Sequence, residues 1–130
     1  MSLVLEALAD RARSVAPAPV LTGRGVSLDA AALLAEVRRL ADRFRDDTSP
    51  VGVLLDNGPA WVVVDLALIA ARRPSVPLPP FFTAAQRDHA LAAAGAGLLV
   101  MPGDEGDPTY GGEPLRFAAT GLPRRPLHAG

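Results

Sequence analysis

The stretch that decides the fold is residues 51–80, VGVLLDNGPAWVVVDLALIAARRPSVPLPP. Its first apolar run, residues 51–55, is long enough for one buried strand, and Pro59 suits the first position of a helix. The apolar content of residues 60–72 is too long for one strand, and a second short apolar run follows at residues 75–78. Two buried strands joined by a helix predict a right-handed βαβ unit and therefore a parallel sheet.

The helix expected at residues 59–72 is apolar on nearly every side, with Asp65 as its only interior charge. Such a helix must be covered on more than one side. We therefore expect part of it to pack against polypeptide outside this chain. Residues 62–64, three valines, would also suit a strand, but the proline start and the alanine-rich end favour the helix.

Upstream, the pattern predicts a helix at residues 3–15, a small hairpin with a glycine turn at residues 23–25, and a helix at residues 28–45. Ser27 is the expected N-cap of the second helix, with Asp29 in its first turn. That helix carries an apolar stripe, which predicts core packing: Leu33, Val37, Leu40 and Phe44.

Downstream, residues 79–82, PPFF, form an extended apolar corner. A helix is expected at residues 84–94 and a third short strand at residues 98–101. Residues 102–130 are expected to be a loop-rich tail with one strand at residues 115–118. These elements predict a three-layer α/β domain with a parallel central sheet.

Residues 20–101 resemble the N-terminal region of the AMP-forming acyl-CoA synthetase and ligase superfamily, the acyl- and aryl-adenylating enzymes. The family pattern there is a strand reading V-x-V-L-L-x-N, a helix that opens with a small residue or proline and an aromatic residue, and then V-P-L-x-P. The family usually has glycine before the second strand, where this chain has Arg72, Arg73 and Pro74, so the helix must end in another way. The matching residues are Val51, Val53, Leu54, Leu55, Asn57, Pro59, Trp61, Val76, Pro77, Leu78 and Pro80.

The resemblance implies a chemistry for a full-length protein. The family joins a carboxylic acid to ATP, releases pyrophosphate, and passes the acyl-adenylate to coenzyme A or another thiol, which implies ATP, Mg²⁺ and coenzyme A. The family's phosphate-binding loop is rich in serine, threonine and glycine and ends in Pro-Lys-Gly, and nothing like it occurs here. All 13 basic residues are arginine, so the chain has no lysine to serve in such a loop.

The resemblance also implies how the chain is organised. Residues 1–130 are expected to be one N-terminal subdomain of an acyl-adenylating enzyme. Residues 1–19 would be an N-terminal helix and linker, and residues 102–130 would lead toward the missing phosphate loop. The expected function is a non-catalytic scaffold fragment of an ATP-dependent carboxylate–CoA ligase, and the corner at residues 79–82 favours a fatty-acid substrate.

Few side chains are candidates for a site. Asp46 and Asp47 are an acidic pair, but they precede the strand at residues 51–55, whereas ligands collect outside the carboxyl ends of parallel strands. Asp56 lies at the correct end and has no evident charged partner nearby in the sequence. His89 stands alone in a helix, where a surface or half-buried role is usual. We therefore predict no catalytic, cofactor-binding or metal-ligating residue in this chain.

Composition excludes several classes of function. The net charge of −1 and pI of about 6.1 give no electrostatic footprint for nucleic acid. The absence of cysteine excludes disulfides and thiolate sites, and no apolar run is long enough for a membrane span. A cytoplasmic, bacterial protein is expected. The arginine pairs are expected to be solvated surface: Arg38-Arg39, Arg72-Arg73 and Arg124-Arg125.

Two other readings stay open at this point. The chain could be a stand-alone binding or interaction domain derived from the same fold, or an unrelated small α/β enzyme or nucleotide binder. The expected partners are the remainder of the parent ligase and, through exposed apolar surface, further copies of the chain.

Overall fold

The computed structural model describes residues 3–12 and 19–122. Its helices are α1 (Leu3–Ala12), α2 (Ala30–Phe44), α3 (Pro59–Ala71) and α4 (Ala84–Ala94), and its strands are β1 (Pro19–Gly23), β2 (Val26–Asp29), β3 (Val51–Val53), β4 (Ser75–Pro77), β5 (Leu98–Pro102), β6 (Thr109–Tyr110) and β7 (Glu113–Ala119).

The main sheet has the strand order β4-β3-β5-β7-β6, and β1 and β2 form a separate antiparallel hairpin. The predicted parallel pairing of β3 with β4 and of β3 with β5 is confirmed. The prediction of a parallel central sheet is wrong for its other half, because β7 runs antiparallel to β5. The chain between β5 and β7 holds only the short strand β6 and turns, and a parallel return needs a longer crossover, usually a helix.

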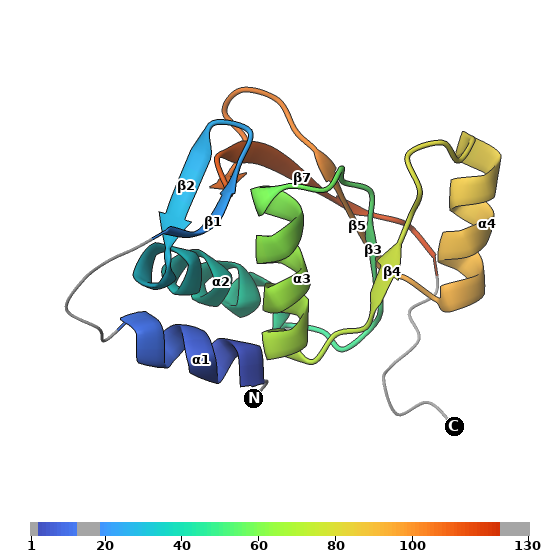
Figure 1. Cartoon of the computed structure of the whole chain (residues 1–130). Helices are drawn as coiled ribbons and strands as arrows, with labels where there is room; N and C mark the ends of the chain where they lie inside the picture. The colour runs from blue at the N-terminus through green and yellow to red at the C-terminus, as the bar shows by residue number, and fades with distance from the viewer. Residues whose placement is uncertain (1–2, 13–18, 123–130) are drawn as a thin grey trace.

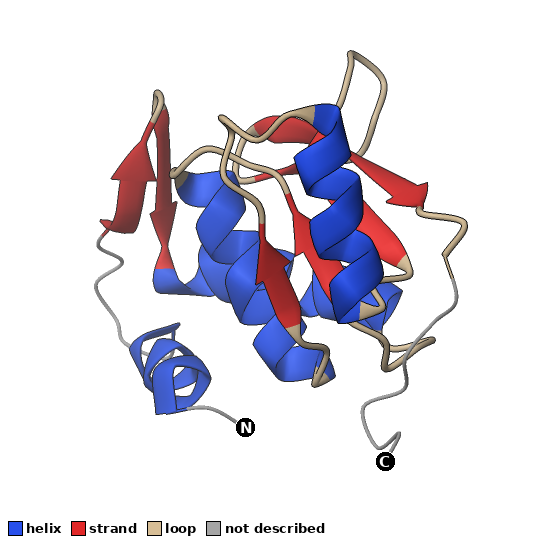
Figure 2. Cartoon of the chain, turned by 90° about the vertical axis from the view of Figure 1, so that its right-hand side faces the viewer, coloured by secondary structure: helices blue, strands red, loops and turns tan. Residues whose placement is uncertain are grey.

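The helices lie on both faces of the sheet, which gives the expected three layers (Figure 1). The connection from β3 to β4 moves across the sheet in one direction, and the connection from β4 to β5 moves back past β3. Right-handed crossovers in opposite directions place their helices on opposite faces. Accordingly, α3 lies with α1 and α2 on one face, and Figure 2 looks onto the other face, where α4 lies in front of the strands.

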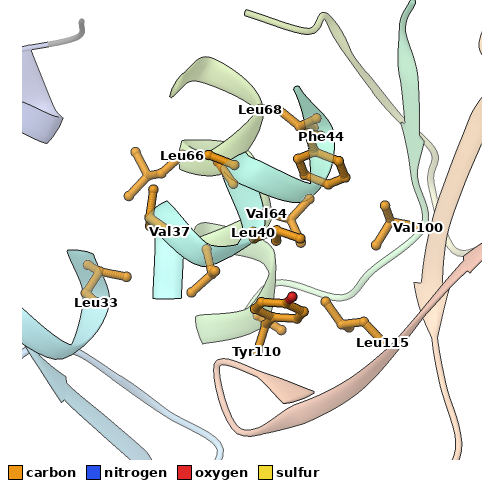
Figure 3. Packing of buried hydrophobic residues seen from close by; sticks show 14 of the residues in the cluster. Leu33, Val37, Leu40, Phe44, Val64, Leu66, Leu68, Val100, Tyr110 and Leu115 are labelled. Atoms are coloured by element: carbon orange, nitrogen blue, oxygen red, sulfur yellow. The ribbon is translucent and has the colours of Figure 1, made fainter. Parts of the chain in front are cut away.

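Each face has its own core. The larger cluster joins the predicted stripe of α2 to α3 and to the strands (Figure 3), and Leu40 and Phe44 are fully buried in it. The smaller cluster lies under α4 and contains Leu78, Leu91 and Leu99. A Cβ at Gly52 would lie 2.4 Å from a methyl group of Leu91, so a larger residue in β3 would displace the Leu91 side chain that packs between α4 and the sheet.

The start of α2 differs from the prediction. Ser27 is not the N-cap, because residues up to Asp29 belong to β2. Asp29 caps the helix instead, and its Oδ1 accepts a hydrogen bond of 2.8 Å from the amide of Ala32. The hairpin that precedes it turns at Arg24 and Gly25, which have φ angles of 51° and 77°. The last part of the helix predicted at residues 3–15 lies outside the described residues.

The helix predicted through residues 62–64 is confirmed, since α3 runs through them. Pro59 is its first residue, as the pattern predicts, and Gly58 is its N-cap. In place of the glycine usual in the family, Arg72 ends the helix in the left-handed conformation, with φ of 60°. Its amide donates to the carbonyl of Ile69 at 3.1 Å, and the amide of Arg73 donates to the carbonyl of Leu68 at 3.0 Å.

Candidate functional site at the carboxyl end of the sheet

The strand order places a candidate site at the carboxyl ends of the parallel strands. The crossover from β3 to β4 and the crossover from β4 back past β3 to β5 run in opposite directions across the sheet, and ligands in open α/β sheets bind at such a switch point. A cavity of ≈ 240 Å³ lies at this position. It is lined by the residues that follow or end the three strands: Leu54, Leu55, Asp56, Pro80 and Pro102.

One carboxylate stands in this apolar lining. Asp56 lies 3.6 Å from the guanidinium of Arg24, which extends from the turn between β1 and β2. The same guanidinium donates a hydrogen bond of 3.3 Å to Glu113 at the start of β7. The expectation that Asp56 has no charged partner is therefore wrong. No signal in the sequence pointed to Arg24, because the hairpin brings it there through tertiary packing.

The geometry of this trio limits its chemistry. Arg24 and Asp56 are largely exposed, and exposed ion pairs contribute about 0–1 kcal/mol. A general acid or base needs a perturbed environment and a partner positioned for proton transfer. Within residues 3–12 and 19–122, no cluster of His, Asp or Glu side chains is arranged to hold a metal ion. The cleft therefore offers an apolar wall with one ion-paired carboxylate at its rim.

The opposite end of the sheet holds a buried arginine. Arg73 is only 5% exposed, so the prediction that Arg72 and Arg73 form a solvated pair is wrong for this member. Its Nε donates to the carbonyl of Ser49 at 2.8 Å, its Nη1 to the carbonyl of Phe44 at 3.2 Å, and its Nη2 to the hydroxyl of Ser49 at 3.2 Å. Arg73 therefore ties the loop after α2 to the start of β4.

Asp46 and Asp47 belong to this anchor and lie at the amino ends of the strands, as predicted. Asp47 is 3.6 Å and Asp46 is 3.8 Å from the guanidinium of Arg73. Burial raises the pKa of Asp47, but hydrogen bonds from Ser49 and Thr48, together with the charge of Arg73, outweigh it and lower the pKa below 3.8. The arrangement keeps Asp47 ionised and holds the loop in place.

The remaining candidates are scattered. His89 is exposed on α4, and Arg38 is exposed on α2. Arg39 donates to the carbonyl of Thr109 at 2.8 Å, and its guanidinium lies 4.5 Å from the ring centre of Tyr110. Arg39 thus contacts β6 from α2 and stays exposed, as predicted. The pair at residues 124–125 lies outside the described residues.

Comparison with known families gives a match that spans most of the chain. The AMP-binding enzyme family matches residues 8–121. The chain belongs to this family. The resemblance noted in the sequence of residues 20–101 is confirmed and extends further in both directions. A comparison with curated proteins gives no match.

Solved structures with a similar fold are also known. The amide bond synthetase Mcba from Marinactinospora thermotolerans is 26% identical, with a TM-score of 0.58 over 73% of this chain. A protein described as a long-chain-fatty-acid CoA ligase from Rhodopseudomonas palustris is 19% identical, with a TM-score of 0.60 over 74% of this chain. The chain spans only 20% and 25% of the length of these two structures. No described helix of this AMP-binding family member is long and apolar enough to cross a membrane.

Proposed function

We propose that this chain is a non-catalytic N-terminal scaffold of an AMP-forming ligase that activates carboxylic acids. The proposal rests on one observation: the chain matches a family of enzymes, but its cleft lacks the side chains that the family's chemistry needs. The family match covers residues 8–121, yet the cleft at the switch point presents only one carboxylate, already paired with Arg24. The chain also contains no lysine, so it lacks the lysine that ends the family's phosphate loop.

In this proposal the cofactors act elsewhere in the parent protein. ATP, Mg²⁺ and coenzyme A would be held by polypeptide beyond residues 1–130, because the chain has no lysine for a phosphate loop and the described residues form no cluster of metal-ligating side chains. The apolar wall formed by Leu54, Leu55 and Pro80 suits a fatty-acid ligase, although family members use other acids. Residues 1–130 would form one subdomain, with residues 1–19 as helix and linker and residues 102–130 leading to the phosphate loop, in a cytoplasmic, bacterial enzyme.

The test is the exchange of labelled pyrophosphate into ATP in the presence of a fatty acid. The purified chain of 130 residues should give the rate of a buffer control. A longer ligase that contains this segment should give exchange that depends on the carboxylate. Exchange by the short chain above the buffer control would overturn the scaffold proposal.

A second candidate, a stand-alone interaction domain, is favoured by the exposed apolar surface. Phe81 is 82% exposed and Ile69 is 47% exposed, although they are large apolar side chains. The ring of Phe81 stands edge-on to Phe82 with 5.7 Å between ring centres. The corner formed by Phe81 and Phe82 is therefore the apolar surface that would form a contact, because exposed apolar patches mark contact sites on soluble proteins. In this reading the chain forms a homo-oligomer through these residues, and light scattering at micromolar concentration would give a mass above that of one chain.

A further inference from the structure

The outer edge of β7 is an open strand edge. In the antiparallel pairing of β7 with β5, the amide of Thr120 donates to the carbonyl of Gly97, and the amide of Gly103 donates to the carbonyl of Pro114. Hydrogen-bonded pairs alternate along such a ladder, so the even-numbered residues of β7 face β5. The backbone groups of Phe117 and Ala119 therefore point away from β5.

Two further bonds support this assignment of the edge. The amide of Leu115 donates outward to the carbonyl of Pro108 at 2.9 Å, and the amide of Leu54 donates to the carbonyl of Val100 on the far side of β5. β6 covers β7 only opposite residues 113 and 114. Among the described residues, the outward amide and carbonyl groups of Phe117 and Ala119 have no backbone partner. Unpaired edges of this kind accept added strands.

The opposite edge of the same sheet is closed to strand addition. The carbonyl of Pro74 accepts from the amide of Val51, and the amide of Leu78 donates to the carbonyl of Val53, so both residues face β3. The backbone groups of Ser75 and Pro77 therefore face outward from β4. Pro77 has no amide hydrogen, and further prolines at positions 74, 79 and 80 flank the strand. Proline blunts edge strands against pairing. The sheet can therefore grow at β7 and not at β4.

The flank of α2 gives this open edge a charge preference. The guanidinium of Arg43 lies 4.2 Å from the ring centre of Phe117, and no described carboxylate lies within ion-pair distance of Arg43. A cavity of ≈ 290 Å³ beside it is lined in part by Arg43, Phe117 and Ala119. Asp46 and Asp47 also line that cavity, but they are paired with Arg73. A second copy of the chain would bring a second Arg43 to the same place, which disfavours pairing of β7 with itself.

We propose that the outer edge of β7 receives an additional β-strand that carries an acidic side chain opposite Arg43. The strand comes from a part of the parent ligase beyond residues 1–130, so this inference rests on the proposed function. The backbone of Phe117 and Ala119 supplies the hydrogen bonds, and Arg43 selects the acidic residue. The strand-addition proposal is tested by amide protection, which is independent of ligase activity. A failure of this test is therefore distinguishable from a failure of the scaffold proposal.

The experiment measures hydrogen exchange of individual amides by NMR in the chain of 130 residues. The probe is a synthetic peptide of alternating valine and threonine, about eight residues long, with one central glutamate. In the free chain, the amides of Phe117 and Ala119 should exchange at least about tenfold faster than that of Ala118, which faces β5. The glutamate peptide should slow exchange at Phe117 and Ala119 at least about tenfold, and the same peptide with lysine should not.

Matched variants separate docking from folding. Ala119→Pro removes the outward amide and should abolish the effect of the peptide, whereas Ala119→Thr keeps the amide and the effect. Arg43→Glu should abolish the preference for the glutamate peptide, and Arg38→Glu on the exposed side of α2 should not. Three results would each overturn the proposal. The first is slow exchange at Phe117 and Ala119 in the free chain, the second is equal protection by both peptides, and the third is protection that rises with chain concentration alone.

Discussion

Replacement of Arg73 tests whether the buried anchor at the amino end of the sheet holds the fold together. Arg73→Met keeps the apolar stem but removes three hydrogen bonds, to Phe44 and to Ser49, and leaves Asp47 without its cation. Breaking a buried ion pair by removing one partner costs about 3–5 kcal/mol. The ion pair of Arg73 with Asp46, which is 81% exposed, contributes little to stability. We therefore expect Arg73→Met to lower the free energy of unfolding by about 3 kcal/mol.

Urea denaturation and thermal unfolding measure this loss. For a domain of this size, about 3 kcal/mol corresponds to a fall of about 10 °C in Tm. Arg73→Lys keeps the charge but not the planar fork, so its loss should be about 1–2 kcal/mol. Arg38→Met, on the exposed side of α2, is the control and should stay within about 0.5 kcal/mol of the unchanged chain. If Arg73→Met lies within about 1 kcal/mol of the unchanged chain, the anchor does not carry this energy.

The pH dependence gives an independent check. The pKa of Asp47 is lowered in the folded chain, so its contribution is present above its unfolded value of 3.8 and is lost as the pH falls through the folded pKa. The difference in stability between the unchanged chain and Arg73→Met should therefore narrow below pH 3.8. A difference that stays constant between pH 7 and pH 3 would indicate that packing of Arg73, and not its charge, stabilises the loop.

Four further substitutions have defined outcomes. Arg72→Gly should raise the free energy of unfolding by about 1 kcal/mol in urea titrations, because glycine adopts the left-handed conformation at φ of 60° without strain; a loss would show that the side chain stabilises the helix end. Gly111→Ala should lower the free energy of unfolding by at least about 3 kcal/mol in the same titrations, because its Cβ would lie 2.4 Å from the backbone nitrogen of Ala60. A smaller loss would mean that β6 can shift. Burial raises the pKa of Asp65, so Asp65→Asn should raise Tm at pH 7 and leave it unchanged at low pH, where the carboxyl is protonated in both states; equal gains at both pH values would contradict this. Phe81→Ser should lower the mass measured by light scattering to that of a single chain, with Arg38→Ser as the unaffected control, and an unchanged oligomer would place the contact elsewhere.

Local pattern was sufficient for the elements that carry strong periodicity or a clear cap. The βαβ unit at residues 51–77 follows from two apolar runs separated by a proline-started helix, and the structure confirms its parallel pairing. At the ends of α4, the structure shows a capping box of Thr83 and Gln86 and a left-handed Gly95, which are also local interactions. In each case the deciding interactions lie within a few residues of one another.

Features that depend on contacts distant in the chain could not be predicted. β7 was expected as a short strand, but its direction depends on how the segment after β5 returns, which no local pattern specifies. The sequence predicts a solvated pair at Arg72 and Arg73. The buried carbonyl groups that accept hydrogen bonds from Arg73 come together only when the loop after Phe44 folds. The pairing of Arg24 with Asp56 likewise requires the hairpin to lie over the start of α3.

The unequal size of the two cores has a consequence for the order in which the molecule opens. α4 contributes a single buried side chain, Leu91, whereas α2 contributes a full stripe to the larger cluster. Segments with few buried apolar contacts detach at lower free energy than the rest of a domain. α4 should therefore unfold as a separate cooperative unit while α2, α3 and the sheet remain folded. In a longer ligase, such partial opening would expose the apolar sheet face around Leu99 to proteolysis or to a neighbouring domain before the fold as a whole is lost.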